Sequence, residues 1–236
     1  MRIPLHRDNH RGSRSLANTL YVSLTLLASM ALSGCVTATV QQVRQASSSL
    51  SSTESVVILS RKHKTRGETE DNFIECVNKN VQKGDDGINV MLEQDFVDAT
   101  FPWFEPRTAP LNVRELSKVI ARPLIAERIE EIGVRYLVWI AGTTVRSGET
   151  GSVNCTMVSG GIPACFGFLT WENDSDYEAS IWDVREGITI GKVSSEAAGT
   201  SFVPAVVVPI PFIARVQHGA CTSLASQLKS FLGAGA

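Results

Sequence analysis

The pattern of apolar and polar positions after residue 55 predicts alternating strands and helices. Residues 56–59 are four consecutive aliphatic side chains, which is typical of a buried strand. Asp71 is a candidate N-cap for a helix whose apolar positions, three and four residues apart, are Phe73, Ile74, Val77 and Val81. The expected order is strand, helix, strand, helix and strand, at residues 56–59, 71–84, 88–92, 112–132 and 134–140.

Turn residues in the second half predict β-hairpins and a final helix. A first hairpin is expected around the turn at residues 159–161 and a second around residues 185–187. Residues 202–214 are apolar but interrupted by prolines, and Pro123 should kink or split the longer helix before them. The terminal helix has an apolar stripe of Val216, Ala220, Leu224, Leu228 and Phe231. We therefore expect one α/β (α+β) domain over residues 56–233, with a mixed sheet that starts β-α-β-α-β.

The first 34 residues have the composition of a secretory signal peptide. Residues 1–18 contain four arginines and one acidic residue, and residues 19–34 contain no charged side chain. A basic stretch followed by a short apolar run is typical of a leader that is removed on export. The run is shorter than the roughly 20 apolar residues that a membrane-spanning helix needs. We expect the leader to end at residue 34.

A four-residue motif closes this leader, because Leu32, Ser33 and Gly34 directly precede Cys35. The motif resembles the lipobox of bacterial lipoproteins. The resemblance implies that Cys35 receives a diacylglyceryl group and acyl chains such as palmitate, which suffice for stable membrane anchoring. Because Val36 replaces the aspartate that retains such proteins in the inner membrane, it also implies an outer-membrane anchor facing the periplasm. The alternative is an ordinary signal peptide with an incidental cysteine.

A serine-rich segment follows the lipidation motif. Five of the six residues at 47–52 are serine, and such small polar runs behave as flexible coils. We expect residues 35–55 to be the lipidated N-terminus and a tether that holds the folded domain away from the bilayer. The alternative is a first helix through residues 40–44.

Two stretches of the domain resemble a group of periplasmic lipoproteins. Residues 129–142 combine a helix end, a glycine, an aromatic residue and a strand ending in glycine, and residues 182–187 combine an acidic residue with a glycine turn. This order is similar to the group of the TolB N-terminal domain, which includes CsgG and LpoB. The resemblance implies a domain that binds another envelope protein or its own copies. Following CsgG, it alternatively implies a secretion or pore subunit whose hairpins enter the membrane.

The expected strand lengths argue against the pore subunit. Membrane-inserted hairpins need about 9–11 residues per strand. The segments around Cys155 and Cys165 are expected to be shorter and richer in turns than that.

Four cysteines remain after Cys35, namely Cys76, Cys155, Cys165 and Cys221. An even number in an exported chain predicts disulfides. The Gly-Gly turn favours pairing Cys155 with Cys165 across a hairpin, which leaves Cys76 for Cys221. Free buried thiols and a four-thiol metal site are the alternatives. Zinc sites usually place cysteines two to four residues apart, and the closest spacing here is ten. We expect no metal and no cofactor.

Few residues of the mature chain suggest catalysis. Nucleophile-elbow, phosphate-loop and HExxH motifs are absent from the sequence. Ser226 and Lys229 fit the bare S-x-x-K pattern, but without its companion motifs this pattern indicates the surface of a helix. We expect a protein without enzymatic activity. The alternative, an envelope hydrolase, would need a pocket that gathers residues such as Asp95, Asp98 or Glu105.

Two features are candidate binding surfaces. The first is a basic cluster that could meet lipid head groups or an acidic partner, and it contains Arg61, Lys62, Lys64 and Arg66. A solvated loop is the alternative. The second combines Trp103 and Phe104 with residues 203–213, which form an interface if exposed and core if buried.

The charge balance excludes one class of partner. The full chain has a formal net charge of −2, and removal of the leader takes away four basic residues and one acidic residue, which leaves 18 against 23, or −5. An acidic exported domain is not expected to bind nucleic acid. We therefore predict a lipid-anchored, non-enzymatic adaptor or assembly factor of the bacterial envelope, which binds another envelope protein or forms homo-oligomers.

Overall fold

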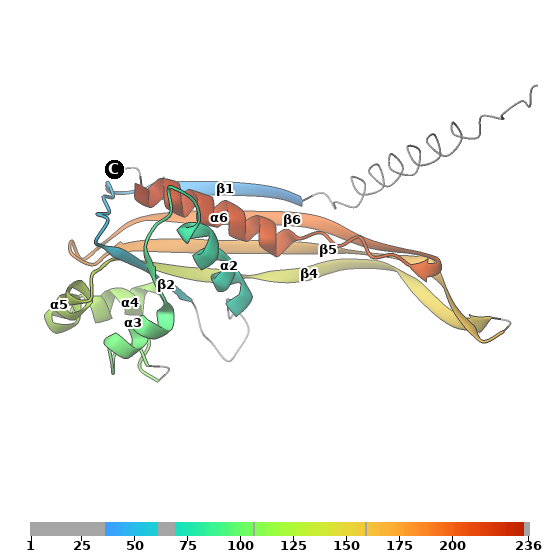
Figure 1. Ribbon diagram of the computed structural model, residues 1–236, viewed down its shortest axis with the longest axis horizontal. Coiled ribbons are helices and arrows are strands. Elements are labelled where there is room, and N and C mark those ends of the chain that lie inside the picture. The colour runs from blue at the N-terminus through green and yellow to red at the C-terminus, as the bar shows by residue number, and fades with distance from the viewer. Residues whose placement is uncertain (1–35, 61–68, 106, 159, 234–236) are drawn as a thin grey trace, which may run out of the picture.

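The computed structural model describes residues 36–60, 69–105, 107–158 and 160–233 (Figure 1). The predicted lipidation motif at residues 32–35 and the basic cluster at residues 61–66 lie outside these ranges. Within them, no helix is both long and apolar enough to cross a membrane.

A mixed sheet of six strands organises the described part of the chain, in the order β1-β6-β5-β4-β2-β3. Strand β2 is parallel to β3 and β4, and the other neighbouring strands are antiparallel. The strands are β1 (Val36–Arg44), β2 (Ser55–Ser60), β3 (Val90–Met91), β4 (Val134–Val158), β5 (Ile162–Asp183) and β6 (Ile188–Pro209). This confirms the predicted α+β class with its mixed sheet, hairpins and terminal helix.

Helices cover both faces of the sheet, as Figure 1 shows. They are α2 (Asp71–Gln82), α3 (Glu93–Ala99), α4 (Val113–Ile120), α5 (Pro123–Glu131) and α6 (Val216–Gly233). Successive residues of a strand face opposite sides, so Val56 and Ile58 pack with α2 and α6 while Val57 and Leu59 pack with α3, α4 and α5. The domain therefore has two apolar cores, one on each face.

Several local predictions hold, and others need correction. The predicted apolar face of α2 is buried, and the longer helix is split into α4 and α5, with Pro123 starting α5. Asp71 is not the N-cap of α2. Glu70 occupies that position without capping through its side chain; its carboxylate instead accepts hydrogen bonds from Thr143 Oγ1 and the Thr144 N–H.

The predicted tether is wrong for residues 36–44, which form strand β1. Val36 lies opposite Gly199 and Arg44 opposite Gly191 on β6. The Arg44 guanidinium lies over the Phe231 ring at 3.8 Å and donates to the Phe231 carbonyl at 2.6 Å. The β-branched start of this segment favours a strand, and β6 supplies the edge that it needs.

The predicted short hairpins are also wrong, because β4, β5 and β6 contain 25, 22 and 22 residues. They form one long antiparallel ribbon. Gly151 and Gly167 have φ values of 89° and 138°, and a Cβ on either would lie 2.1 Å from a carbonyl oxygen of the neighbouring strand. Because glycine lacks a Cβ, the two strands can approach closely at these positions. Gly151 and Gly167 therefore continue the ribbon and do not end it in a turn.

Candidate functional site: an uncharged β arm

The distal part of the ribbon projects past α2 and α6 at the end of the molecule opposite α4 and α5 (Figure 1). We call it the arm and define it as residues 150–158, 160–170 and 200–213. The arm contains no Asp, Glu, Lys or Arg side chain. An uncharged ribbon outside the main body is unusual for a surface that faces only water.

The register of the arm is held by a disulfide. Cys155 lies opposite Cys165 and is bonded to it, with a Cα–Cα distance of 3.9 Å. Cys165 in turn lies opposite Val207 on β6. After the end of β6, Phe212 returns to pair with Phe202 through two backbone hydrogen bonds. The arm is thus a cross-linked three-stranded ribbon with a short returning segment.

Exposed apolar side chains concentrate on the arm. It holds ten of the seventeen large hydrophobic side chains exposed in the described residues. They are Met157, Val158, Ile162, Phe166, Phe168, Val206, Val207, Val208, Ile210 and Ile213. Val206 is 81% exposed and Phe168 51%. This is an extended apolar surface, of a kind that marks a binding region.

Both faces of the arm carry exposed apolar side chains, although β4 contributes the exposed polar residues Ser152, Asn154 and Thr156 to one of them. Phe166 lies opposite Val206, and Phe168, two residues along, shares their face. On this face Phe202 stacks on Phe212, with ring centroids 4.6 Å apart. The opposite face presents Met157 together with the disulfide and Val207.

Charged and aromatic groups mark the base of the arm. The Arg146 guanidinium lies 4.5 Å from the centroid of the Trp171 ring and pairs with Glu149 at 2.7 Å. Asp174 accepts a hydrogen bond from Ser147 at 2.9 Å. Val36, the first described residue, also lies near this base because it pairs with Gly199.

One edge of the arm has no neighbouring strand in the described residues. Strand β2 pairs with β4 only as far as Ile140, and the Thr144 N–H is taken by Glu70 at 2.8 Å. From Val145 to Val158, β5 is the one neighbour of β4 within the described ranges. Natural proteins usually protect such an edge, since it can accept a further strand.

The register indicates which N–H groups point out of this edge. The short Cα–Cα distance between Cys155 and Cys165 is that of a non-hydrogen-bonded pair, in which the backbone groups of both residues face away from each other. Val153 occupies the equivalent position two residues earlier. The Val153 N–H therefore points out of the edge, and the Asn154 N–H points toward β5.

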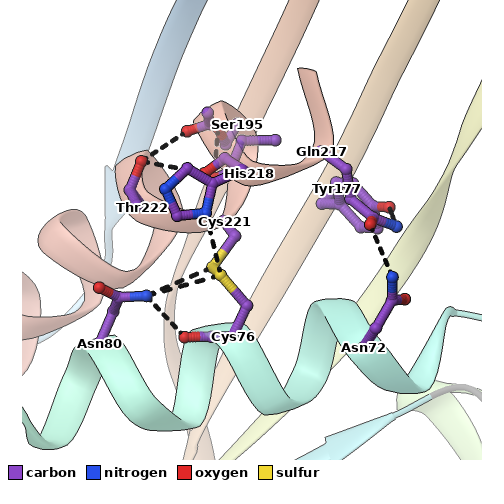
Figure 2. Close-up of a disulfide and its surroundings, with 11 residues drawn as sticks. Asn72, Cys76, Asn80, Tyr177, Ser195, Gln217, His218, Cys221 and Thr222 are labelled. Carbon is purple, nitrogen blue, oxygen red and sulfur yellow. Dashed lines mark hydrogen bonds between the residues drawn. A yellow bond between two sulfur atoms is a disulfide. The ribbon is translucent and has the colours of Figure 1, made fainter. Parts of the chain in front are cut away.

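A second disulfide joins α2 to α6 in the body of the domain (Figure 2). Cys76 and Cys221 are 145 residues apart in sequence, with a Cα–Cα distance of 6.2 Å. Asn80 donates to the Cys76 carbonyl at 2.8 Å, and His218 Nδ1 lies 3.9 Å from Cys76 Sγ. Both cysteine pairs favoured by the sequence are therefore present as disulfides.

A partly buried polar network joins the N-terminus of α2 to the sheet. Glu70 accepts from the Tyr177 hydroxyl at 2.8 Å, and Thr144 Oγ1 lies 2.8 Å from the same hydroxyl. The Tyr177 ring stacks on Phe73. Burial, together with the nearby Glu70 carboxylate, raises the pKa of Tyr177 well above its ordinary value.

The two stretches that carry the family resemblance meet in a buried ion pair. Arg135 Nη2 lies 2.7 Å from Asp183 Oδ2, with side-chain exposures of 9% and 3%. Asp183 Oδ1 also accepts from the Glu186 N–H at 3.0 Å. Beside the pair is a cavity of about 40 Å³, and it is lined by Glu54, Glu130, Gly133, Val134, Arg135 and Arg185.

The candidate residues from the sequence do not form one site. Phe104 is buried and packs edge-on against Phe96 at 4.8 Å, so it belongs to the core and not to an interface. Trp103 packs partly buried against the same core. Residues 203–213 instead belong to the exposed arm.

The residues considered for catalysis are also dispersed. Asp95 and Asp98 are exposed on α3, where Asp98 accepts from Gln94. Ser226 is exposed on α6, and Lys229 Nζ pairs with Asp86 at 2.7 Å. This confirms that the S-x-x-K pattern belongs to a surface turn of a helix.

Comparisons with known proteins return solved structures alone. No family model and no curated protein matches the chain. The chain is similar to a PelC dodecamer from Paraburkholderia phytofirmans, with 14% identity, 83% of this chain and 97% of that chain covered, and a TM-score of 0.37. A single-substitution variant of that PelC dodecamer gives 15% identity, coverages of 83% and 98%, and the same TM-score.

Proposed function

We propose that this protein is a non-enzymatic, lipid-anchored lipoprotein of the bacterial envelope that acts as an adaptor or assembly factor. In this proposal a strand from a second copy, or from another envelope protein, pairs with the open β4 edge. The observation that carries the proposal is this edge, which has no described neighbour from Val145 to Val158.

As far as the structure describes the chain, the open edge lacks the usual protection against strand addition. Natural edge strands are blocked by charged side chains, prolines, bulges or covering elements. Here a bulge between Ser147 and Thr150 and the charges of Arg146 and Glu149 lie at the base only. Residues 150–158 contain no charge and no proline. The Cys155–Cys165 bond keeps this edge ordered before a partner arrives, which lowers the entropic cost of pairing.

The leader sequence supports the lipid anchor, and strand β1 supports a position of that anchor close to the folded domain. Strand β1 begins at Val36, one residue after the predicted lipidation site, and is paired with β6. The folded domain would therefore be held directly at the membrane surface. Palmitate at Cys35 and attachment to the outer membrane facing the periplasm are parts of this proposal.

The decisive experiment measures the assembly state of the lipidated protein. The protein is extracted from membranes in mild detergent after brief crosslinking, and its mass is determined by light scattering. We expect a homo-oligomer or a complex with an envelope protein. Recovery of the monomer alone would contradict the proposal.

Two adjacent proline substitutions separate edge pairing from folding. Val153→Pro removes an N–H that points out of the edge, so we expect it to abolish association and leave the hairpin folded. Asn154→Pro removes an N–H that points toward β5, so it should destabilise the hairpin itself. Association that survives Val153→Pro would show that the edge is not the contact.

The strand lengths also support a second candidate function, a secretion or pore subunit. Residues 150–158 and 162–170 supply nine residues per strand, within the range that membrane-inserted hairpins use. The expectation of short strands therefore no longer argues against this candidate. Ion conductance of the assembled protein in a planar bilayer would support it, and an electrically silent bilayer containing assembled protein would contradict it.

A further inference from the structure

The second long edge of the arm, on β6, is protected against strand addition. Phe202 and Phe212 exchange two backbone hydrogen bonds, at 2.9 and 2.8 Å, and the Ile210 N–H donates to the Pro204 carbonyl at 3.1 Å. Pro204 has no N–H to offer a partner. Beyond it, Val207 has a φ of 76°, which interrupts the extended backbone. An incoming strand therefore finds no continuous ladder on β6.

This difference between the two edges limits how arms can pair with one another. Head-to-tail pairing would join β4 of one copy to β6 of the next, and the returning segment that contains Phe212 obstructs it. Two copies can instead join β4 to β4 about a two-fold axis, which closes the assembly after two copies. Hydrogen-bonded and non-hydrogen-bonded pairs alternate along antiparallel strands. Two-fold symmetry therefore requires that one residue lie opposite its own copy.

The charge pattern of β4 selects that residue. Asn154 is the middle residue of the uncharged run at residues 150–158. When Asn154 lies opposite its own copy, the whole run overlaps with itself. The bulge and the charges of Arg146 and Glu149 then stay outside the paired region. A register centred at Ser152 would bring Glu149 into the ladder, so we expect the register centred at Asn154.

In this register, side chains of the same kind face each other. Ser152 lies opposite Thr156 of the second copy, and such hydroxyl pairs stabilise neighbouring strands. On the other face, Val153 lies opposite Cys155 of the second copy. The backbone groups of Val153 and Cys155 point out of the edge, so the two residues form a hydrogen-bonded pair. The edge is thus complementary to itself in both backbone and side chains.

We propose that two copies of this chain pair antiparallel through residues 150–158 of β4, with Asn154 opposite Asn154. The inference rests on the proposed function and names a second copy as the partner. The two-fold axis of such a pair is perpendicular to the sheet, so both copies present their Phe166 faces on the same side. The two lipid anchors predicted at Cys35 then lie at the same level and fit one membrane.

The test places charges at the residue that meets its own copy. Asn154 is exposed, and its N–H points toward β5, so it forms a non-hydrogen-bonded pair, in which facing side chains lie closest. Asn154→Asp brings two carboxylates together and Asn154→Lys brings two ammonium groups together, and both contacts are repulsive. A mixture of the two variants brings opposite charges together.

The measurement is the dissociation constant of the lipidated protein in mild detergent, from light scattering over a dilution series. We expect each Asn154 variant alone to dissociate about tenfold more readily than the unmodified protein, or more. An equimolar mixture should return to within about threefold of the unmodified protein. Ser226→Asp and Ser226→Lys are the matched controls, because Ser226 is exposed on α6 in the body, and neither should change association. Circular dichroism confirms that each variant is folded.

Two results would overturn the inference. Asn154 variants that associate as tightly as the unmodified protein would show that Asn154 lies outside the contact. Variants that stay dissociated when mixed would show that Asn154 faces a different residue, as it would in pairing with β1 of a neighbour or with another protein.

Val153→Pro in the same assay separates this inference from the proposed function. Association that is lost in Val153→Pro but not restored by mixing the Asn154 variants would refute self-pairing and leave the adaptor proposal intact. Recovery of the unmodified protein as a monomer alone would refute the adaptor proposal itself.

Discussion

Removal of the Asp183 carboxylate is a direct test of how the two resemblance-bearing stretches hold the domain together. Arg135 and Asp183 are both more than nine-tenths buried and lie 2.7 Å apart. Among the described residues, Arg135 Nε and Nη1 have no hydrogen-bond partner, and Asp183 supplies the charged contact of this buried guanidinium. Asp183→Ala leaves that cation unpaired. Breaking a buried pair in this way costs about 3–5 kcal/mol.

The assay is urea denaturation of the oxidised protein, followed by circular dichroism. In a thermal melt of the same variants, a loss of this size lowers the melting temperature of a domain of this length by roughly 6–20 °C. Glu178→Ala is the matched control, because Glu178 pairs with Lys192 at 2.7 Å with both side chains about half exposed. Exposed pairs contribute about 0–1 kcal/mol.

A double variant shows whether the cost comes from the orphaned charge. Arg135→Met combined with Asp183→Leu replaces the pair by apolar groups, and such replacements are often neutral or stabilising. We expect the double variant to be more stable than Asp183→Ala. The reasoning is refuted if Asp183→Ala costs no more than Glu178→Ala, or if the double variant loses as much stability as the single one.

Three further predictions concern cross-links, strain and pH. Replacing Cys76 and Cys221 by alanine should lower the free energy of unfolding by about 5 kcal/mol, and replacing Cys155 and Cys165 should lower it by about 3 kcal/mol, because the first bond closes the longer loop. Equal losses of stability in urea denaturation would contradict this account. Val207 has a φ of 76°, which is unfavourable for a β-branched residue. Val207→Gly should therefore stabilise the folded protein by about 1 kcal/mol, whereas the control Val206→Gly should not. Loss of stability in both variants on thermal unfolding would refute the assignment of strain. The raised pKa of Tyr177 means that the folded state retains a proton that the unfolded state loses above about pH 10. Stability should therefore fall as pH rises above 10, and an alkaline slope that persists in Tyr177→Phe would exclude Tyr177 as its source.

The local pattern of apolar residues predicts the elements whose structure depends on a single segment of the chain. The four apolar positions of α2 are spaced for a single helical face, and all four are buried. Pro123 cannot donate a backbone hydrogen bond, so the division between α4 and α5 was predictable. The Gly-Gly turn brings Cys155 opposite Cys165 because the hairpin is closed by neighbouring residues.

The elements that were mispredicted depend on distant segments. The β-branched start of residues 36–44 favours a strand, but the segment forms β1 only because β6 presents an edge to it more than 140 residues later. Phe104 and residues 203–213 are similarly apolar in sequence, yet Phe104 is buried in the core while residues 206–211 are exposed. Burial depends on which other elements cover a segment, and local composition carries little of that information.

The sequence predicts the α+β class, the helices with a single apolar face, the leader and the lipidation site, and it favours the two cysteine pairs that the structure contains. These depend on spacing and composition within short segments. The fold shows that β4, β5 and β6 run on into an arm, that one edge of β4 has no neighbour in the part of the chain that the structure describes, and that β1 lies at the base of the arm. An open edge and an uncovered face are defined by neighbours, and neighbours are set by the fold.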